Sequence, residues 1–151
     1  MNLDQSPMLK IHKFMFLADK LFDRELHTRF AISFSQFRML AVISKQPGIS
    51  QKHIACIQET TQAAVSRHID VLADMEYVAL TTNSNNRKEH NLHLTQKGKT
   101  LMEKACEYVE NRSDEILSVL GNKRKLELGS IFDILVDTVR KDYEDTNVPC
   151  I

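Results

Sequence analysis

The stretch TTQAAVSRHIDVL, residues 60–72, predicts a helix with one buried and one exposed face. Val65, Ile69 and Leu72 recur at intervals of three and four residues and mark the buried face. Thr60 or Thr61 is suited to cap the helix, because a threonine oxygen accepts a hydrogen bond from a free amide of the first turn. The outward side of the first two turns carries small or hydrogen-bonding residues, which is unusual for a helix that only packs. These residues are Gln62, Ala63, Ser66 and Arg67.

Two helices are predicted before this stretch. Ser50 is a suitable cap for a short helix from Gln51 to about Ile57, and a polar turn follows it. Ser35 is expected to cap an earlier helix, which Pro47-Gly48 ends because proline cannot continue the backbone hydrogen bonds. The apolar residues of that earlier helix are Phe37, Leu40, Ala41 and Ile43.

Two strand-like runs follow, at residues 77–82 and 89–94, with the polar loop 83–88 between them. The second run alternates polar and apolar residues, and the asparagines of the loop tolerate left-handed backbone. The pattern predicts an antiparallel hairpin that leans on helices, since two strands alone are marginally stable. A short helix, a turn, a longer helix and a hairpin in this order are typical of a helix-turn-helix with a wing.

Long helices flank this unit. One runs from about Met8 to Thr28, a second begins after its cap Thr95 and continues to Leu120, and a third follows Gly121. Their apolar faces are broader than a small central unit needs, so we expect part of this surface to meet another copy of the chain. The apolar residues of the last helix are Leu128, Ile131, Phe132, Leu135, Val136 and Val139.

Composition and charge set further bounds. The 151 residues, 42% hydrophobic, favour one compact domain, and Lys+Arg 20 against Asp+Glu 20 give zero net charge. Any surface for an anionic partner must therefore be a local patch. Residues 1–45 carry seven basic and four acidic side chains (+3), whereas residues 96–151 carry nine and eleven (−2), so such a partner should approach the first two thirds of the chain. No apolar run approaches the roughly 18 residues of a membrane span, and we expect a soluble, cytoplasmic protein.

The three cysteines, Cys56, Cys106 and Cys150, are odd in number and far apart. This spacing argues against a disulfide framework and against a structural zinc site. We expect neither a metal nor a cofactor.

Several stretches together resemble the MarR family of bacterial transcriptional regulators. They are Ala64–Leu72, then Val78, the basic loop Asn86-Arg87-Lys88, and Leu94-Thr95-Gln96-Lys97-Gly98. The resemblance extends from about Leu9 to Val139, and its specificity lies in the order and spacing of these stretches. It implies a mainly α fold: a winged helix-turn-helix with a two-stranded antiparallel wing, flanked by N- and C-terminal dimerisation helices. The corresponding parts are residues 1–33 (N-terminal dimerisation helix), 34–95 (DNA-binding unit) and 96–151 (C-terminal dimerisation helices).

The expected DNA contacts lie in three places. A recognition helix enters the major groove by its N-terminal end, where free amides attract phosphate and small residues permit close approach. Arg67 is then placed to read a guanine edge or to hold a phosphate. By analogy with the fold, the start of the preceding helix touches the DNA backbone, and Arg87 resembles the family's minor-groove arginine. The full set is Ser50, Gln51, Lys52, Gln62, Ala63, Ser66, Arg67, Arg87 and Lys88.

The sequence departs from the family pattern at several positions. Asn86 stands where an aspartate often braces the wing arginine, and Leu80 replaces a commonly basic residue of the first wing strand. Gln58-Glu59 replaces the usual leucine and glycine of the helical turn, and Glu76-Tyr77 replaces a pair that contains glycine. We expect the turn and the start of the wing to be shaped differently.

The resemblance also implies an effector. Family members commonly bind aromatic or anionic ligands between the dimerisation helices and the winged unit, and this chain is rich in aromatic residues there. The candidate ligand-binding residues are Phe14, Phe22, Phe34 and Met39. An ordinary dimer core explains the same residues equally well.

We therefore expect a homodimeric repressor that binds a pseudo-palindromic DNA operator and is released by a small aromatic or anionic effector. An enzyme is not expected, because no nucleophile elbow, phosphate-binding glycine loop or His-x-x-x-His pattern is present. Two alternatives remain. One is a winged helix used to bind proteins, which the four basic residues of the near-neutral segment 46–95 favour. The other is a regulator of the same family that senses oxidants through a cysteine.

Overall fold

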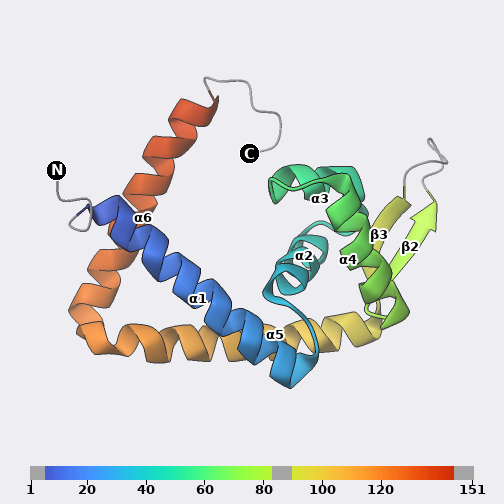
Figure 1. Ribbon diagram of the computed structural model, residues 1–151, viewed down its shortest axis with the longest axis horizontal. Coiled ribbons are helices and arrows are strands. Elements are labelled where there is room, and N and C mark those ends of the chain that lie inside the picture. Colours follow the sequence, from blue (N-terminus) through green and yellow to red (C-terminus); the bar gives the residue numbers. More distant parts are fainter. Residues whose placement is uncertain (1–5, 83–89, 145–151) are drawn as a thin grey trace.

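The computed structural model describes residues 6–82 and 90–144, which form an arm and a lobe (Figure 1). The lobe combines three helices with a small sheet at one end of α5, and the arm consists of α1, the rest of α5 and α6. The elements are α1 (Pro7–Phe30), α2 (Phe34–Lys45), β1 (Ile49–Ser50), α3 (Gln51–Ile57), α4 (Gln62–Asp74), β2 (Val78–Thr82), β3 (His90–Leu94), α5 (Gln96–Leu117), the 3-10 turn η2 (Ser118–Leu120) and α6 (Gly121–Glu144). The predicted mainly helical, winged helix-turn-helix fold is confirmed.

The sheet has three antiparallel strands in the order β1-β3-β2. Strands β2 and β3 pair from Val78 opposite Leu94 to Thr82 opposite His90, which confirms the predicted hairpin. On the other edge of β3, Ile49 pairs with Leu92. We did not predict β1, because two residues are too short to show the alternation that identifies a strand.

The buried core lies in the lobe and extends onto the end of α1, where Leu26 is fully buried, and onto the start of α5. Leu40 of α2, Ile69 of α4 and Leu92 of β3 are fully buried in one cluster, which Leu101 and other residues of α5 close. The sheet and the three helices of the lobe therefore form one packed unit with the first turns of α5.

Side-chain caps fix where the helices begin. The hydroxyls of Ser50, Thr61 and Thr95 accept hydrogen bonds from amides three residues on, at 3.2, 3.2 and 3.0 Å, as predicted. The prediction for α2 was wrong: Ser33, not Ser35, is its cap. The Ser33 hydroxyl accepts from the amide of Gln36, whose side-chain oxygen accepts from the amide of Ser33. This reciprocal pair satisfies two free amides, which Ser35, an exposed residue inside the first turn, cannot do.

The predicted helix from Thr95 to Leu120 ends three residues early, at Leu117, where the 3-10 turn η2 begins. Gly121 then opens α6 with a φ of 72°, a left-handed conformation that glycine adopts without strain. Within the described residues, no helix has both the length and the hydropathy that a membrane crossing requires.

Candidate nucleic-acid interface

Helices α3 and α4 form the helix-turn-helix, and the turn between them is held by its own backbone. The amide of Glu59 donates to the carbonyl of Cys56 at 3.1 Å, and the amide of Thr60 donates to the carbonyl of Ala55 at 2.9 Å. Thr61 then caps α4. The N-terminal end of α4 therefore starts at a defined point.

The predicted recognition face of α4 is exposed. Gln62, Ala63 and Arg67 are exposed and Ser66 is half-buried, whereas the opposite side of the helix is fully buried in the core. Arg67 Nε donates to the carbonyl oxygen of Ala63 at 3.2 Å, which turns the guanidinium toward the first turn of the helix. A guanidinium has five N–H donors, so the Arg67 side chain keeps donors for an outside acceptor.

The other predicted contacts are placed differently. Ser50 is half-buried and its hydroxyl caps α3, with half-buried Gln51 and exposed Lys52 beside it in the first turn. This turn belongs to the lobe because α3 packs against α4 and β1. Arg87 and Lys88 lie outside the described residues, as does Asn86.

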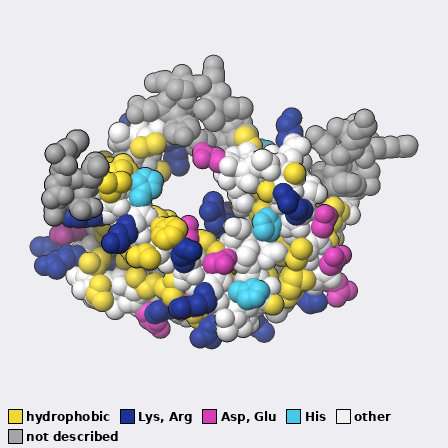
Figure 2. Space-filling view, in the orientation of Figure 1, with side chains coloured by type: hydrophobic (Ala, Val, Ile, Leu, Met, Phe, Trp, Pro, Cys, Tyr) yellow, Lys and Arg dark blue, Asp and Glu magenta, His cyan; other side chains and the backbone are white. Residues whose placement is uncertain are grey.

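Charge over the lobe is mixed. Figure 2 shows basic and acidic side chains interspersed on the face in view. On α4 itself, Arg67 is followed by the exposed acids Asp70 and Asp74, and Glu59 is exposed in the turn before it. The positive potential of the described recognition surface therefore depends on Arg67, Lys52 and the amide end of α4.

Leu80 is exposed on β2, with 39% of its surface accessible. A basic side chain at this place would add a phosphate contact, and leucine cannot. This departure from the family pattern is thus a difference at the surface of the wing and leaves the core unchanged.

The Leu-Thr-x-x-Gly stretch at residues 94–98 joins the wing to α5. The hydroxyl of Thr95 accepts from the amide of Gly98 at 3.0 Å and donates to the carbonyl of Glu76 at 2.6 Å. The amide of Thr95 donates to the carbonyl of Tyr77 at 3.0 Å. Thr95 therefore caps α5 and also fixes the segment that leads into β2.

Glu59 and Glu76 both have left-handed backbone, with φ values of 48° and 61°. Glu59 stands where the family pattern has glycine, and Glu76 belongs to the pair that replaces a glycine-containing pair. The conformation is one that glycine adopts without strain and that costs an L-residue about 1–2 kcal/mol. Beside Glu59, the buried Nε2 of Gln58 has no hydrogen-bond partner among the described residues. Both the left-handed Glu59 and the unpaired Gln58 amide therefore lower the stability of the turn between α3 and α4.

We expect Glu59→Gly to raise the free energy of unfolding by about 0.5–1 kcal/mol, because the relief of left-handed strain exceeds the entropy that glycine loses on folding. Urea denaturation followed by circular dichroism measures this difference. Glu59→Ala is the matched control: it removes the same carboxylate and keeps the strain, so its stability should stay within about 0.5 kcal/mol of the parent. Equal stabilisation by alanine and glycine would show that charge, and not backbone strain, governs this position.

A cavity of about 550 Å³ lies between α1, α2, α5 and α6. Three of the four predicted ligand-binding residues, Phe14, Phe22 and Phe34, line it, and its charged lining residues are Asp19 and Lys125. The fourth, Met39, is 1% exposed in the core of the lobe and does not line this cavity. The helical period puts Met39 on the same face of α2 as Leu40 and Ile43, away from Phe34.

The cysteines differ in state. Burial, with a smaller effect of Glu110, raises the pKa of the free Cys106 thiol, although Lys45 acts in the opposite direction. A protonated thiol is a poor nucleophile, which makes Cys106 a weak candidate for redox sensing. Cys56 is disulfide-bonded. Within residues 6–82 and 90–144, no group of three or more His, Cys, Asp or Glu side chains is arranged to hold a metal.

Comparisons with known proteins agree with this architecture. The MarR family model matches residues 32–90. A protein of Thauera aromatica assigned to regulation of the hcr operon is 22% identical over 127 residues, which cover 84% of this chain and 75% of that protein.

Among solved structures, the transcriptional regulator BldR of Sulfolobus solfataricus is 27% identical, with a TM-score of 0.73 and coverage of 86% and 92% of the two chains. MarR of E. coli is 20% identical, with a TM-score of 0.78 and coverage of 86% and 96%. The transcriptional repressor CouR, solved on a 23-mer DNA duplex, is 21% identical, with a TM-score of 0.78 and coverage of 89% and 94%.

The capped α3 and α4, the turn between them and the wing define a winged helix-turn-helix protein. Residues 32–90 match the MarR family, and the fold along most of the chain is similar to that of MarR-family transcriptional regulators.

Proposed function

We propose that the protein is a sequence-specific DNA-binding repressor in which α4 reads the major groove. The observation that carries this proposal is the N-terminal half of α4: its outward side is exposed, small at Ala63, and equipped with the hydrogen-bonding groups of Gln62, Ser66 and Arg67. The start of α3, with Ser50, Gln51 and Lys52, would hold the DNA backbone. Arg87 and Lys88 would contribute from the wing.

The DNA-binding form is a homodimer on a pseudo-palindromic operator. Exposed apolar side chains on both α1 and α6 support this, because a single chain leaves them in water. They include Met8, Leu9, Phe14, Met15, Phe16 and Leu17 on α1 and Ile131, Phe132, Leu135, Val136 and Val139 on α6. A two-fold axis through this arm would place two α4 helices about 34–36 Å apart, one turn of DNA.

The cavity between α1, α2, α5 and α6 is the proposed effector site. Its volume of about 550 Å³ is that of a small-molecule pocket, and aromatic side chains form much of its wall. An aromatic or anionic effector that binds better to a dimer with a different spacing of its α4 helices would release the DNA.

Arg67→Ala should weaken binding to a specific DNA site by about tenfold to a hundredfold and relax the preference at one base pair, because a bidentate arginine contributes about 1–3 kcal/mol of discrimination. The measurement is fluorescence anisotropy on DNA from the region upstream of the protein's gene, or selected from a random pool, over a salt series.

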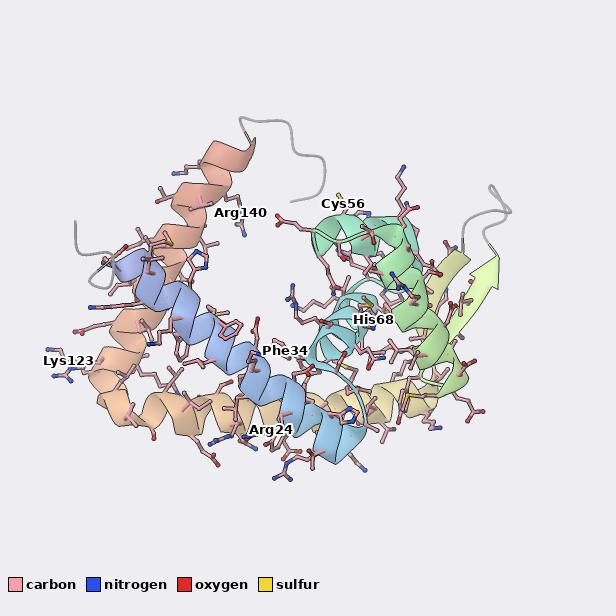
Figure 3. The ribbon with its side chains drawn as sticks, in the orientation of Figure 1. Arg24, Phe34, Cys56, His68, Lys123 and Arg140 are labelled. Atoms are coloured by element: carbon pink, nitrogen blue, oxygen red, sulfur yellow. The ribbon has the colours of Figure 1, made fainter. Side chains whose placement is uncertain are left out.

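The matched control for Arg67→Ala is Arg124→Ala, which removes the same charge from the first turn of α6. Figure 3 shows that the neighbouring Lys123 lies at the end of the arm remote from the lobe. This control should change affinity less than threefold, by long-range charge alone. Equal losses in both variants would contradict a reading role for α4.

The alternative is a winged helix that binds a protein. The mixture of acidic and basic side chains over the lobe favours it, since a DNA surface is normally strongly basic. Absence of any selected DNA sequence and of salt-dependent binding by the parent protein would support this alternative.

A further inference from the structure

Helix α1 of the arm holds the N-terminus of α2 in the lobe. The Asp23 carboxylate accepts a hydrogen bond from the amide of Phe34, the first residue of α2, at 2.9 Å. The Ser33–Gln36 capping box satisfies two neighbouring amides at 2.8 and 3.1 Å. Three amides at this end of the helix therefore have side-chain acceptors, and the one supplied by α1 is charged, which suits the positive end of the helix dipole.

Phe34 also forms part of the cavity wall. The Phe34 ring stacks on Phe22 of α1, with ring centroids 5.6 Å apart, and both residues line the cavity. On its other side Phe34 stacks on Phe37 of α2 at 6.0 Å. Figure 3 shows Phe34 where α1 and α2 meet. An occupant that displaces the Phe34 ring must therefore disturb the first turn of α2.

Helix α2 and the recognition helix share the core of the lobe. Leu40 and Ile43 of α2 are fully buried in one cluster with Val65 and Ile69 of α4. Close-packed interiors transmit a displacement because they have no spare volume to absorb it. A shift at the N-terminus of α2 consequently changes the position of α4 relative to the arm.

We propose that Asp23 and Phe34 are positioning residues that couple the cavity to the DNA-reading helix: the hydrogen bond between them holds α2 in the DNA-binding position, and a cavity ligand that moves the Phe34 ring breaks it. This inference rests on the proposed function for its consequence on DNA. The coupling itself is a property of the protein without DNA.

The first test compares Asp23→Ala with Asp19→Ala in the full-length protein. Both residues are exposed acids of α1 one turn apart, but Asp19 lines the cavity and has no described hydrogen bond to α2. Hydrogen exchange of the amides of residues 34–37 and of α4 should rise roughly tenfold in Asp23→Ala and stay unchanged in Asp19→Ala, because loss of a cap opens the first turn. Unchanged exchange in Asp23→Ala, or equal changes in both variants, would overturn the proposal.

The second test uses 1-anilinonaphthalene-8-sulfonate as an aromatic probe. The fluorescence of the probe should increase in the presence of the parent protein and of Phe34→Leu. The probe should speed the hydrogen exchange of residues 34–37 in the parent alone, because leucine cannot stack on Phe22. Fluorescence without faster exchange in the parent overturns the coupling. Absence of a fluorescence increase with the parent overturns the coupling as well, because a cavity that binds no aromatic probe cannot displace the Phe34 ring.

DNA affinity separates this inference from the proposed function. Asp23→Ala should bind specific DNA roughly fivefold more weakly than Asp19→Ala. Loss of a helix cap costs about 1 kcal/mol, and this cost would shift the protein away from the DNA-binding position of α2 by about that factor. A parent protein that binds no DNA would contradict the proposed function, while the exchange measurements would still decide whether Asp23 and Phe34 couple the cavity to α4.

Discussion

Gly98→Ala is expected to lower the free energy of unfolding by about 3 kcal/mol or more, among the largest effects of a single methyl group. A Cβ atom at position 98 would lie 2.1 Å from the carbonyl oxygen of Tyr77 and 3.0 Å from its carbonyl carbon. These are backbone atoms of the segment that leads into β2, so no side-chain rotation can make room. The helix or the wing must move.

Either movement is costly because the junction is hydrogen-bonded on both sides. Thr95 donates to the carbonyls of Glu76 and Tyr77 and also caps α5 at Gly98. Separation of α5 from the wing would therefore remove a helix cap and leave backbone carbonyls without partners. The glycine of the Leu-Thr-x-x-Gly stretch is needed for close approach, and not for a special backbone conformation.

Urea denaturation of Gly98→Ala and of Gly129→Ala measures this effect with the same chemical change in two helices. A Cβ at Gly129 of α6 would meet no atom within 4 Å. Gly129→Ala should therefore be neutral or stabilise by up to about 1 kcal/mol through helix propensity. A Gly98→Ala protein that unfolds within about 1 kcal/mol of the parent would show that the wing and α5 separate easily.

Local signals made most of the lobe predictable from sequence. Ser50, Thr61 and Thr95 each stand before an apolar period of 3.6 residues, and all three cap the helix that follows. Ser33 has the same chemistry, but Ser35 lies two residues later and the sequence offers both. The presence of Gln36 three residues after Ser33 is the capping-box signal that distinguishes them.

The rest of the site depends on contacts between distant residues, which periodicity does not contain. Asp23 and Phe34 are eleven residues apart on different helices, and their hydrogen bond appears only when α1 and α2 fold against each other. The sequence marked Phe22 and Phe34 as aromatic, and the fold places both on one cavity. Met39 has a similar apolar character, yet one turn of helix puts it in the core.

Leu135→Asp is expected to convert the proposed homodimer to a monomer and to weaken binding to a two-half-site operator by at least about a hundredfold. The reason is that a dimer that binds two half-sites at once has an affinity higher than that of one lobe by about this factor. On the helical wheel Leu135 is central to the apolar stripe of α6 that also contains Phe132 and Val139. It is 44% exposed in the single chain. A carboxylate buried there in a dimer would have no partner. This burial costs several kcal/mol, which opposes the free energy of dimerisation.

Light scattering after size exclusion gives the mass, with 17.4 kDa for one chain and twice that for the dimer. Ser130→Asp is the control, because it adds the same charge at an exposed serine on the other side of α6 from Leu135 and should leave the mass and the DNA affinity unchanged. A Leu135→Asp protein that keeps the dimer mass would show that α6 lies outside the interface. A monomer that retained full affinity for the two-half-site operator would contradict the two-fold docking of α4, and each lobe would then have to bind DNA independently.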